Sequence, residues 1–175
     1  MVPDQLTDME NCNIYVNIDR GKKMKAFEMI KKYTPCFLKA VNSYKEFQYT
    51  FWVIGCWILQ YPKTFKGGRL VQEGDEVTQD EADQILKDHL AEFELPAGDW
   101  SENQKEALLS VMHFIQKETW PDSPLCKAIE AGDMETARTE WEALKAVNFE
   151  GLDFPAWRDE EIKLFFGVDK KEETK

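Results

Sequence analysis

Two histidines, His89 and His113, are the side chains best suited to acid–base or metal chemistry near neutral pH. They fall on separate predicted helices, and no cysteine or carboxylate around them has the spacing of a metal site. The sequence also contains no G-x-S-x-G, Walker or G-x-G-x-x-G motif. We therefore expect no metal and no cofactor, and we interpret each imidazole as a hydrogen-bonded or solvated side chain.

Cysteine chemistry is also poorly supported by spacing. The chain has four cysteines with no C-x-x-C pair among them: Cys12, Cys36, Cys56 and Cys126. Free cysteines are among the most buried residues in proteins, whereas zinc sites and disulfide frameworks have recognisable spacings. We predict buried, reduced thiols.

The charge of the chain is strongly negative. Lysine and arginine number 22 against 33 aspartate and glutamate, which gives a formal net charge of −11 and a pI of about 4.7. A phosphate backbone would be repelled, so we expect no nucleic-acid partner. With 175 residues, of which 43% are hydrophobic, the chain can bury the core of one compact domain, which excludes a fibre or a disordered tail.

The sequence gives no sign of membrane insertion or of Sec-type export. Its longest apolar run, Phe51 to Leu59, is less than half of the roughly 20 residues that a membrane-spanning helix needs. The first residues, MVPDQLTDMENCN, are acidic and polar, unlike a signal peptide. We expect a protein that is cytoplasmic as synthesised, and a holin-like or other non-Sec release to the envelope stays open.

The elements expected in the first half are a helix and a small sheet. Apolar residues at helical spacing predict a helix from Lys22 to about Thr34, which Pro35 should end. Aromatic and β-branched residues between Val41 and Tyr61 predict one or two strands, and Ile14 to Ile18 could form an edge strand. Residues 61–77 are predicted to be a loop with brief extended pieces.

Capping motifs predict that the second half is helical. Thr78 with Glu81, and Ser101 with Gln104, have the spacing of capping boxes. The expected helices are one that stops before Pro96, one that runs to about Glu118, one from Ser123-Pro124 to Gly132, one from Met134 to about Ala146, and one from Pro155 to Gly167.

Six segments, in matching order and spacing, resemble the phage-type lysozymes, which are glycoside hydrolases also called muramidases or endolysins. VQEGDEVTQDEADQILKDHLAEFE is similar to a turn followed by T-x-x-E-A-x-x-L-L, and ENQKEALLSVMHF is similar to N-Q-x-x-A-L-x-S-F-x-F-N. SPLCKAIEAGDMETARTEW resembles S-x-L-L-x-x-L-N-A-G-D-x-x-x-A-x-x-E-F, and GLDFPAWRDEEIKLFFG resembles G-L-x-x-R-R-x-x-E-x-x-L-F. Upstream, KAFEMIKKYTPCFLKAV and TFWVIGCWI resemble the first helix and the T-I-G-x-G-H hairpin, so the likeness covers Met24 to Gly167.

The resemblance implies a lysozyme-like fold of the α+β class that is mainly helical. A small N-terminal β-hairpin or sheet would precede a C-terminal helical bundle. It divides the chain into an N-terminal extension of unknown role (1–21), a lysozyme-like domain (22–168) and a charged tail (169–175).

The resemblance also implies hydrolysis of the glycosidic backbone of peptidoglycan. That reaction needs a carboxyl group that protonates the leaving oxygen and a second carboxylate that stabilises the oxocarbenium-like state. In the family these groups are a Glu at the end of the first helix and an Asp entering the hairpin, with a Thr just before I-G.

Carried over, the family's functional positions hold residues that cannot act as their counterparts. The Glu falls on Thr34, the Thr on Val53 and the final His of the hairpin on Ile58. The Asp falls on Ser43 or Phe47, depending on the direction of counting. The resemblance therefore implies a degenerate catalytic motif, as in a pseudoenzyme.

Two carboxylates stand near these positions and are weak catalytic candidates. Glu46 is one residue from Phe47, and Glu28 lies about 9 Å along the helix axis from Thr34 at 1.5 Å per residue. For both, a solvated charge is the simpler interpretation.

Aromatic side chains are the candidates for ligand binding. Trp52 and Trp57, with Tyr49, fall where the family's hairpin borders its cleft, and sugars stack on such rings. His113 and Phe114 replace the family's cleft-facing F-N pair, which makes the expected cleft less polar. Core packing accounts for most of the other aromatics.

Three functions follow as alternatives. The first is a catalytically impaired lysozyme-like domain that acts as a glycan-binding or interaction module, with peptidoglycan or a related glycan as partner. The second is an active muramidase that uses Glu46 or Glu28, and the third is a protein-interaction module without glycan affinity. The negative charge weighs against the second, because enzymes that attack anionic walls usually carry a positive surface.

Overall fold

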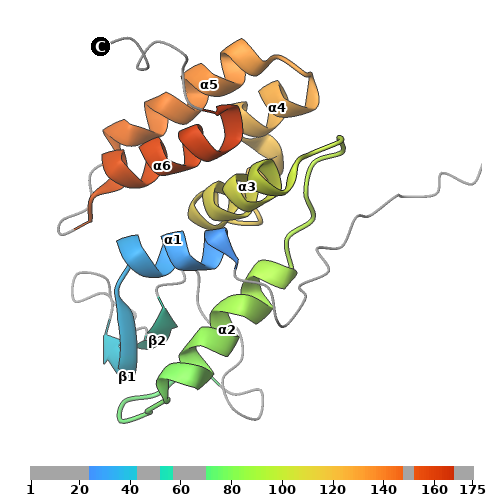
Figure 1. Cartoon of the computed structure of the whole chain (residues 1–175). Helices are drawn as coiled ribbons and strands as arrows, with labels where there is room; N and C mark the ends of the chain where they lie inside the picture. The colour runs from blue at the N-terminus through green and yellow to red at the C-terminus, as the bar shows by residue number, and fades with distance from the viewer. Residues whose placement is uncertain (1–23, 43–51, 57–69, 148–151, 168–175) are drawn as a thin grey trace, which may run out of the picture.

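The computed structural model describes residues 24–42, 52–56, 70–147 and 152–167. A small sheet with one long helix lies on one side of the short helix α1, and a bundle of helices lies on the other (Figure 1). In chain order the elements are α1 (Lys25–Tyr33), β1 (Cys36–Asn42), β2 (Trp52–Cys56), α2 (Gln79–Ala91), α3 (Glu102–Ile115), the 3₁₀ turn η2 (Trp120–Asp122), α4 (Pro124–Glu130), α5 (Met134–Ala143), the 3₁₀ turn η3 (Leu144–Ala146) and α6 (Phe154–Phe166). The mainly helical α+β architecture predicted from the sequence is confirmed.

The sheet consists of β1 and β2, which pair antiparallel, with Cys36 opposite Cys56 and Val41 opposite Val53. A third segment extends the other edge of β1, where Val77 N–H donates to the Leu38 carbonyl at 2.9 Å. The expectation that strands begin near Val41 was wrong for β1. This strand begins directly after Pro35, and its backbone pairing to two distant segments is a tertiary feature that the local pattern does not carry.

The capping motifs are confirmed in detail. Both capping boxes form, at Thr78 before α2 and at Ser101 before α3. The prediction that α3 runs to Glu118 was wrong, because Gln116 takes a φ of 78° and stops the helix at Ile115. Helix α5 likewise ends at Ala143 and continues only as the 3₁₀ turn η3.

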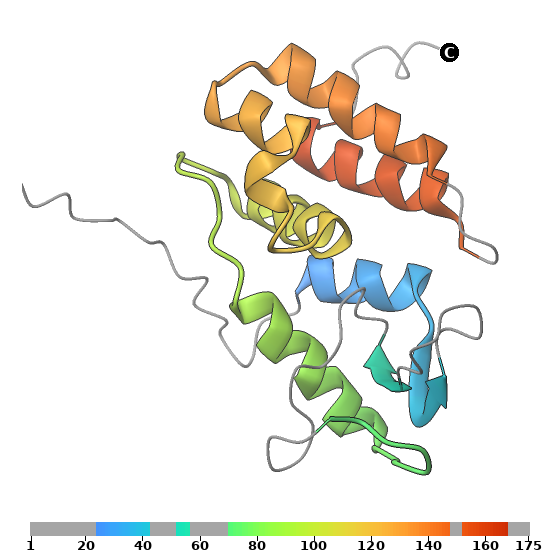
Figure 2. The same ribbon diagram turned by 180° about the vertical axis from the view of Figure 1, so that it is seen from behind.

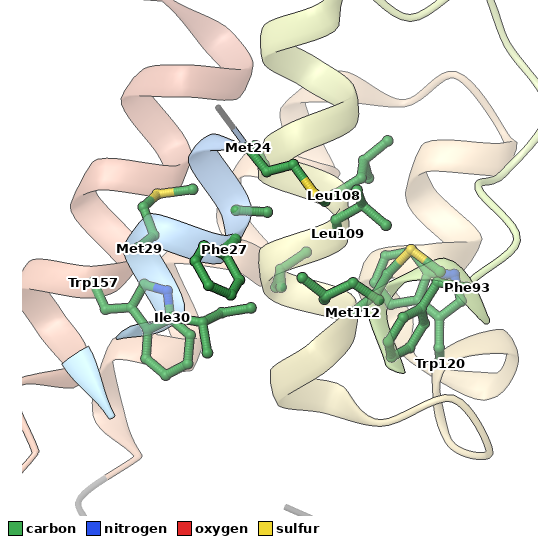
Figure 3. Close-up of a cluster of buried hydrophobic side chains, with 14 of the residues drawn as sticks. Met24, Phe27, Met29, Ile30, Phe93, Leu108, Leu109, Met112, Trp120 and Trp157 are labelled. Atoms are coloured by element: carbon green, nitrogen blue, oxygen red, sulfur yellow. The ribbon is translucent and has the colours of Figure 1, made fainter. Parts of the chain in front are cut away.

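The core is centred on α3, which packs against both α1 and α6. Phe27 and Ile30 of α1 approach Leu108 and Met112 of α3 in one buried cluster (Figure 3). Seen from behind, α1 again lies between the sheet and the helical bundle (Figure 2). This position makes α1 the element that joins the two parts, and the residue directly after it, Thr34, is the one that the resemblance assigns to the family's acid.

The expected edge strand at 14–18 and the charged tail at 169–175 lie outside the described residues. Within the described part of the chain, no helix has both the length and the apolar character needed to cross a bilayer.

Candidate functional site at the end of helix α1

Thr34, the residue that the sequence resemblance assigns to the family's acid position, caps the C-terminus of α1. Its backbone turns extended, at φ −121° and ψ 148°, just before Pro35. The side chain is 7% exposed, and its hydroxyl donates to the Ile30 carbonyl at 2.6 Å. This hydroxyl proton is therefore held by the helix end, and a threonine hydroxyl is in any case no acid near neutral pH.

Aromatic rings surround the last turn of α1 on the side of α6. Tyr33 stacks on Trp157 with ring centroids 6.0 Å apart, and Phe114 meets Trp157 edge-on at 6.2 Å. The guanidinium of Arg158 lies over both Phe114 and Trp157, at 4.5 and 4.4 Å from their centroids. Phe114, the predicted ligand contact, is half-buried with one face covered by Arg158, and its ligand-binding role stays a prediction.

Glu160 of α6 lies beside Tyr33 in this cluster. It accepts hydrogen bonds from Tyr33 Oη at 2.8 Å and from Lys32 Nζ at 2.6 Å. Partial burial opposes ionisation, but the hydrogen bonds from Lys32 and Tyr33 outweigh it and hold the pKa of Glu160 below its ordinary value. Glu160 is an anion at neutral pH and cannot serve as a proton donor.

Glu161, the next residue, belongs to a buried polar network that sequence reasoning missed. Its Oε1 accepts from Ser110 Oγ at 2.5 Å and from an Arg158 terminal nitrogen at 2.9 Å, and its Oε2 accepts from Trp141 Nε1 at 2.9 Å. Burial raises the pKa of Glu161, and the charge of Arg158 opposes that shift. The residue has no exposed surface, so a saccharide cannot reach this carboxyl group.

A signal for this network was present in the sequence. Arg158 and Glu161 stand three residues apart on one helix, which places them on the same face. Without the fold, that spacing is also typical of an exposed ion pair.

The remaining predicted site residues are placed apart from Thr34 or lie outside the description. Glu28 is exposed on the face of α1 that borders α6. Trp52 and Val53 belong to β2, and at these two positions the structure describes the backbone but not the side chains. Outside the described residues lie Ser43, Glu46, Phe47, Tyr49, Trp57 and Ile58.

The two histidines meet at the contact of α2 with α3. Their rings are T-shaped with centroids 5.4 Å apart, and His113 is buried. Burial lowers the pKa of His89, which favours a neutral imidazole. In residues 24–42, 52–56, 70–147 and 152–167, no group of three or more potential ligands could hold a metal ion.

The cysteine prediction is confirmed at one position. Cys126 is a buried free thiol, and burial raises its pKa to about 11. Cys36 is also free but only half-buried. Cys12 lies outside the described residues, and of Cys56 only the backbone is described.

Comparison with known proteins points to one family. The sequence model described as phage lysozyme matches residues 39–154. No curated protein matches the sequence.

Similar solved structures include three lysozyme-like chains. The muramidase domain of SpmX from Asticaccaulis excentricus is 21% identical with a TM-score of 0.58, and the match covers 85% of this chain and 96% of that one. A mutant P22 lysozyme is 18% identical with a TM-score of 0.60, and the match covers 82% of this chain and 97% of that one. The endolysin of the Escherichia coli O157:H7 phage FAHEc1 is 19% identical with a TM-score of 0.58, and the match covers 82% of this chain and 91% of that one. At these identities the likeness shows a shared fold.

Proposed function

Because the chain belongs to the phage lysozyme family, we propose that it is a catalytically impaired member that binds peptidoglycan without cleaving it. The observation that supports the proposal is Thr34, a buried hydroxyl bonded to the Ile30 carbonyl at the position that the resemblance assigns to the general acid. Loss of a positioned general acid typically lowers the rate by about a hundred- to ten-thousand-fold.

Two carboxyl groups of α6, Glu160 beside Tyr33 and the buried Glu161, do not offer a substitute. Glu160 is held ionised by Lys32 and Tyr33, so it lacks the proton that the leaving oxygen would need. Glu161 carries a raised pKa, as a general acid would, but it is enclosed by Ser110 and Trp141. The scaffold is thus kept, while one of these two carboxyl groups is held ionised and the other is inaccessible.

The test uses the full chain and purified, insoluble peptidoglycan. We expect the protein to co-sediment with the polymer and to release no reducing ends between about pH 4 and pH 9, while an active phage lysozyme releases them under the same conditions. Release of reducing ends would support the rival, an active muramidase. Glu46→Gln and Glu28→Gln variants would then identify which carboxylate is used.

Failure to co-sediment would instead favour the third alternative, a protein-interaction module without glycan affinity. Retention and hydrolysis are measured on the same samples. Each of the three functions therefore predicts a different pair of results.

A further inference from the structure

A groove lies between α1 and α6, and its residues Lys32 and Glu160 also belong to the cluster at the last turn of α1. Its volume is about 620 Å³, within the range of roughly 300 to 1,000 Å³ that is typical of small-molecule sites. Glu28 lines the groove, whereas Thr34 lies about 9 Å further along α1 and about 120° around its axis. A ligand in the groove would therefore contact a different face of α1.

The floor of the groove is apolar. Met29 of α1 is 3% exposed, and Leu164 of α6 is half-buried beside it. Figure 3 shows Met29 on the side of α1 away from Leu108 and Leu109, so this side chain does not contribute to the contact with α3. Small aliphatic groups of a ligand could pack on these two side chains.

The rim carries charges that are not balanced within the described part of the chain. Lys32 is paired with Glu160, but Lys25 Nζ contacts only a neutral partner, the Asn103 side-chain oxygen, at 2.6 Å. Lys163 and Glu28 line the groove without an ion pair to any described residue. Two ammonium groups and one carboxylate are left to face a ligand.

This local charge is opposite to that of the whole molecule. The groove has three lysines against two glutamates, in a chain whose net charge is −11. An anionic ligand would be repelled by most of the surface and attracted here. The most complementary ligand is short, carries two or more carboxylates and one ammonium group, and has small apolar side chains.

We propose that the groove between α1 and α6 binds the peptide stem of peptidoglycan, an inference that rests on the proposed function. A stem whose third residue is lysine carries carboxylates, one ammonium group and alanine methyls. Its carboxylates would pair with Lys25 and Lys163, its ammonium group with Glu28, and its methyls would lie on Met29 and Leu164. The chain would then recognise the peptide as well as the glycan strand.

The test is titration of the full chain with a synthetic stem tetrapeptide of the lysine type whose N-terminus is acetylated, followed by NMR or calorimetry. We expect saturable binding that weakens about fivefold in Lys163→Gln, the factor that an exposed charge pair typically supplies. The matched control is Lys105→Gln on α3, whose lysine pairs with Glu102 outside the groove. Its affinity should equal that of the wild type.

A second variant tests the ammonium contact. Glu28→Gln should weaken binding of the tetrapeptide but leave binding of its side-chain-acetylated analogue unchanged. Equal losses for both peptides would overturn the assignment of Glu28. Circular dichroism of each variant checks that it is folded, which is expected because Glu28 and Lys163 are exposed.

The two proposals fail in different ways. A chain that is retained on whole peptidoglycan but does not bind the tetrapeptide overturns the groove assignment and leaves the proposed function standing. A chain that is not retained on peptidoglycan overturns the proposed function. Preference for an acidic amphipathic helix over the tetrapeptide would mark the groove as a protein-docking site and would also overturn the assignment.

Discussion

At the scale of single residues, the resemblance implies a change beside Thr34 as well as at Thr34 itself. In the family pattern G-L-x-x-R-R-x-x-E, Trp157 stands at the first of two arginines, and Arg158 stands at the second. Trp157 stacks on Tyr33, the residue before Thr34. On this alignment, Thr34 stands in place of the family's acidic side chain, and Trp157 stands in place of an arginine.

Restoring the acid alone should not restore hydrolysis. We expect Thr34→Glu to release no reducing ends from peptidoglycan, because the family's hairpin Asp and Thr positions also lack their groups, the latter holding Val53. Thr34→Gln, similar in size but without an acid, is the control for disruption of the helix end. Measurable turnover by Thr34→Glu would show that the hairpin has been aligned wrongly to the family.

The depressed pKa of Glu160 can be measured directly. We expect the pKa of this carboxyl group, followed by NMR, to rise toward the ordinary glutamate value in Lys32→Gln, since a donated hydrogen bond is lost. Because the folded-state pKa is the lower one, the stabilisation exists above the unfolded pKa and disappears as the pH falls through the folded pKa. Unfolding free energies of wild type and Lys32→Gln should therefore converge in acid.

At the scale of elements, α6 connects the two sides of the site. Its buried face holds Glu161 against Ser110 of α3 and Trp141 of α5, while its exposed face supplies Glu160 and Lys163 to the groove. One helix thus fixes the bundle and positions charges toward α1.

The sequence predicted where helices begin better than it predicted which distant residues contact one another. The caps at Thr78 and Ser101 were predictable because the Thr or Ser side chain and its partner are three residues apart, so the signal is local. The start of β1 and the burial of Glu161 depend on segments far along the chain, and no local pattern encodes them. The assignment of Thr34 to the acid position came from the resemblance, because alignment to the family's motifs matches single residues, whereas hydrophobic periodicity does not.

The network in α6 should dominate the stability of the bundle. We expect Glu161→Gln to lower the free energy of unfolding by about 3 to 5 kcal/mol, because it leaves the guanidinium of Arg158 buried without its counter-ion. Glu102→Gln removes an exposed pair with Lys105 and should cost less than about 1 kcal/mol. Urea denaturation of both variants measures the difference, and equal losses would contradict the assigned role of the buried pair.

At the scale of the whole molecule, the charge of −11 sets the conditions under which the proposed binding can occur. Cell walls that carry teichoic acids or other phosphates are anionic, so the long-range force on an approaching chain is repulsive. The fields are screened within about 10 Å at 0.1 M salt, which weakens the long-range repulsion much more than the short-range contacts of a binding site. The proposed contacts therefore act against the average field of the protein.

Salt should consequently have opposite effects on two forms of the same polymer. Retention on walls that keep their anionic polymers should increase as salt is raised from about 10 to 150 mM, because the Debye length shortens from about 30 to 8 Å. On peptidoglycan stripped of those polymers, the groove's pairing with stem carboxylates is the main electrostatic contribution, so retention should fall slightly. Co-sedimentation at both salt concentrations measures the retained fraction on each polymer. For the Lys163→Gln variant, we expect retention on the stripped polymer to be the same at both salt concentrations. A decrease on both polymers would show that local attraction outweighs the net charge even at long range.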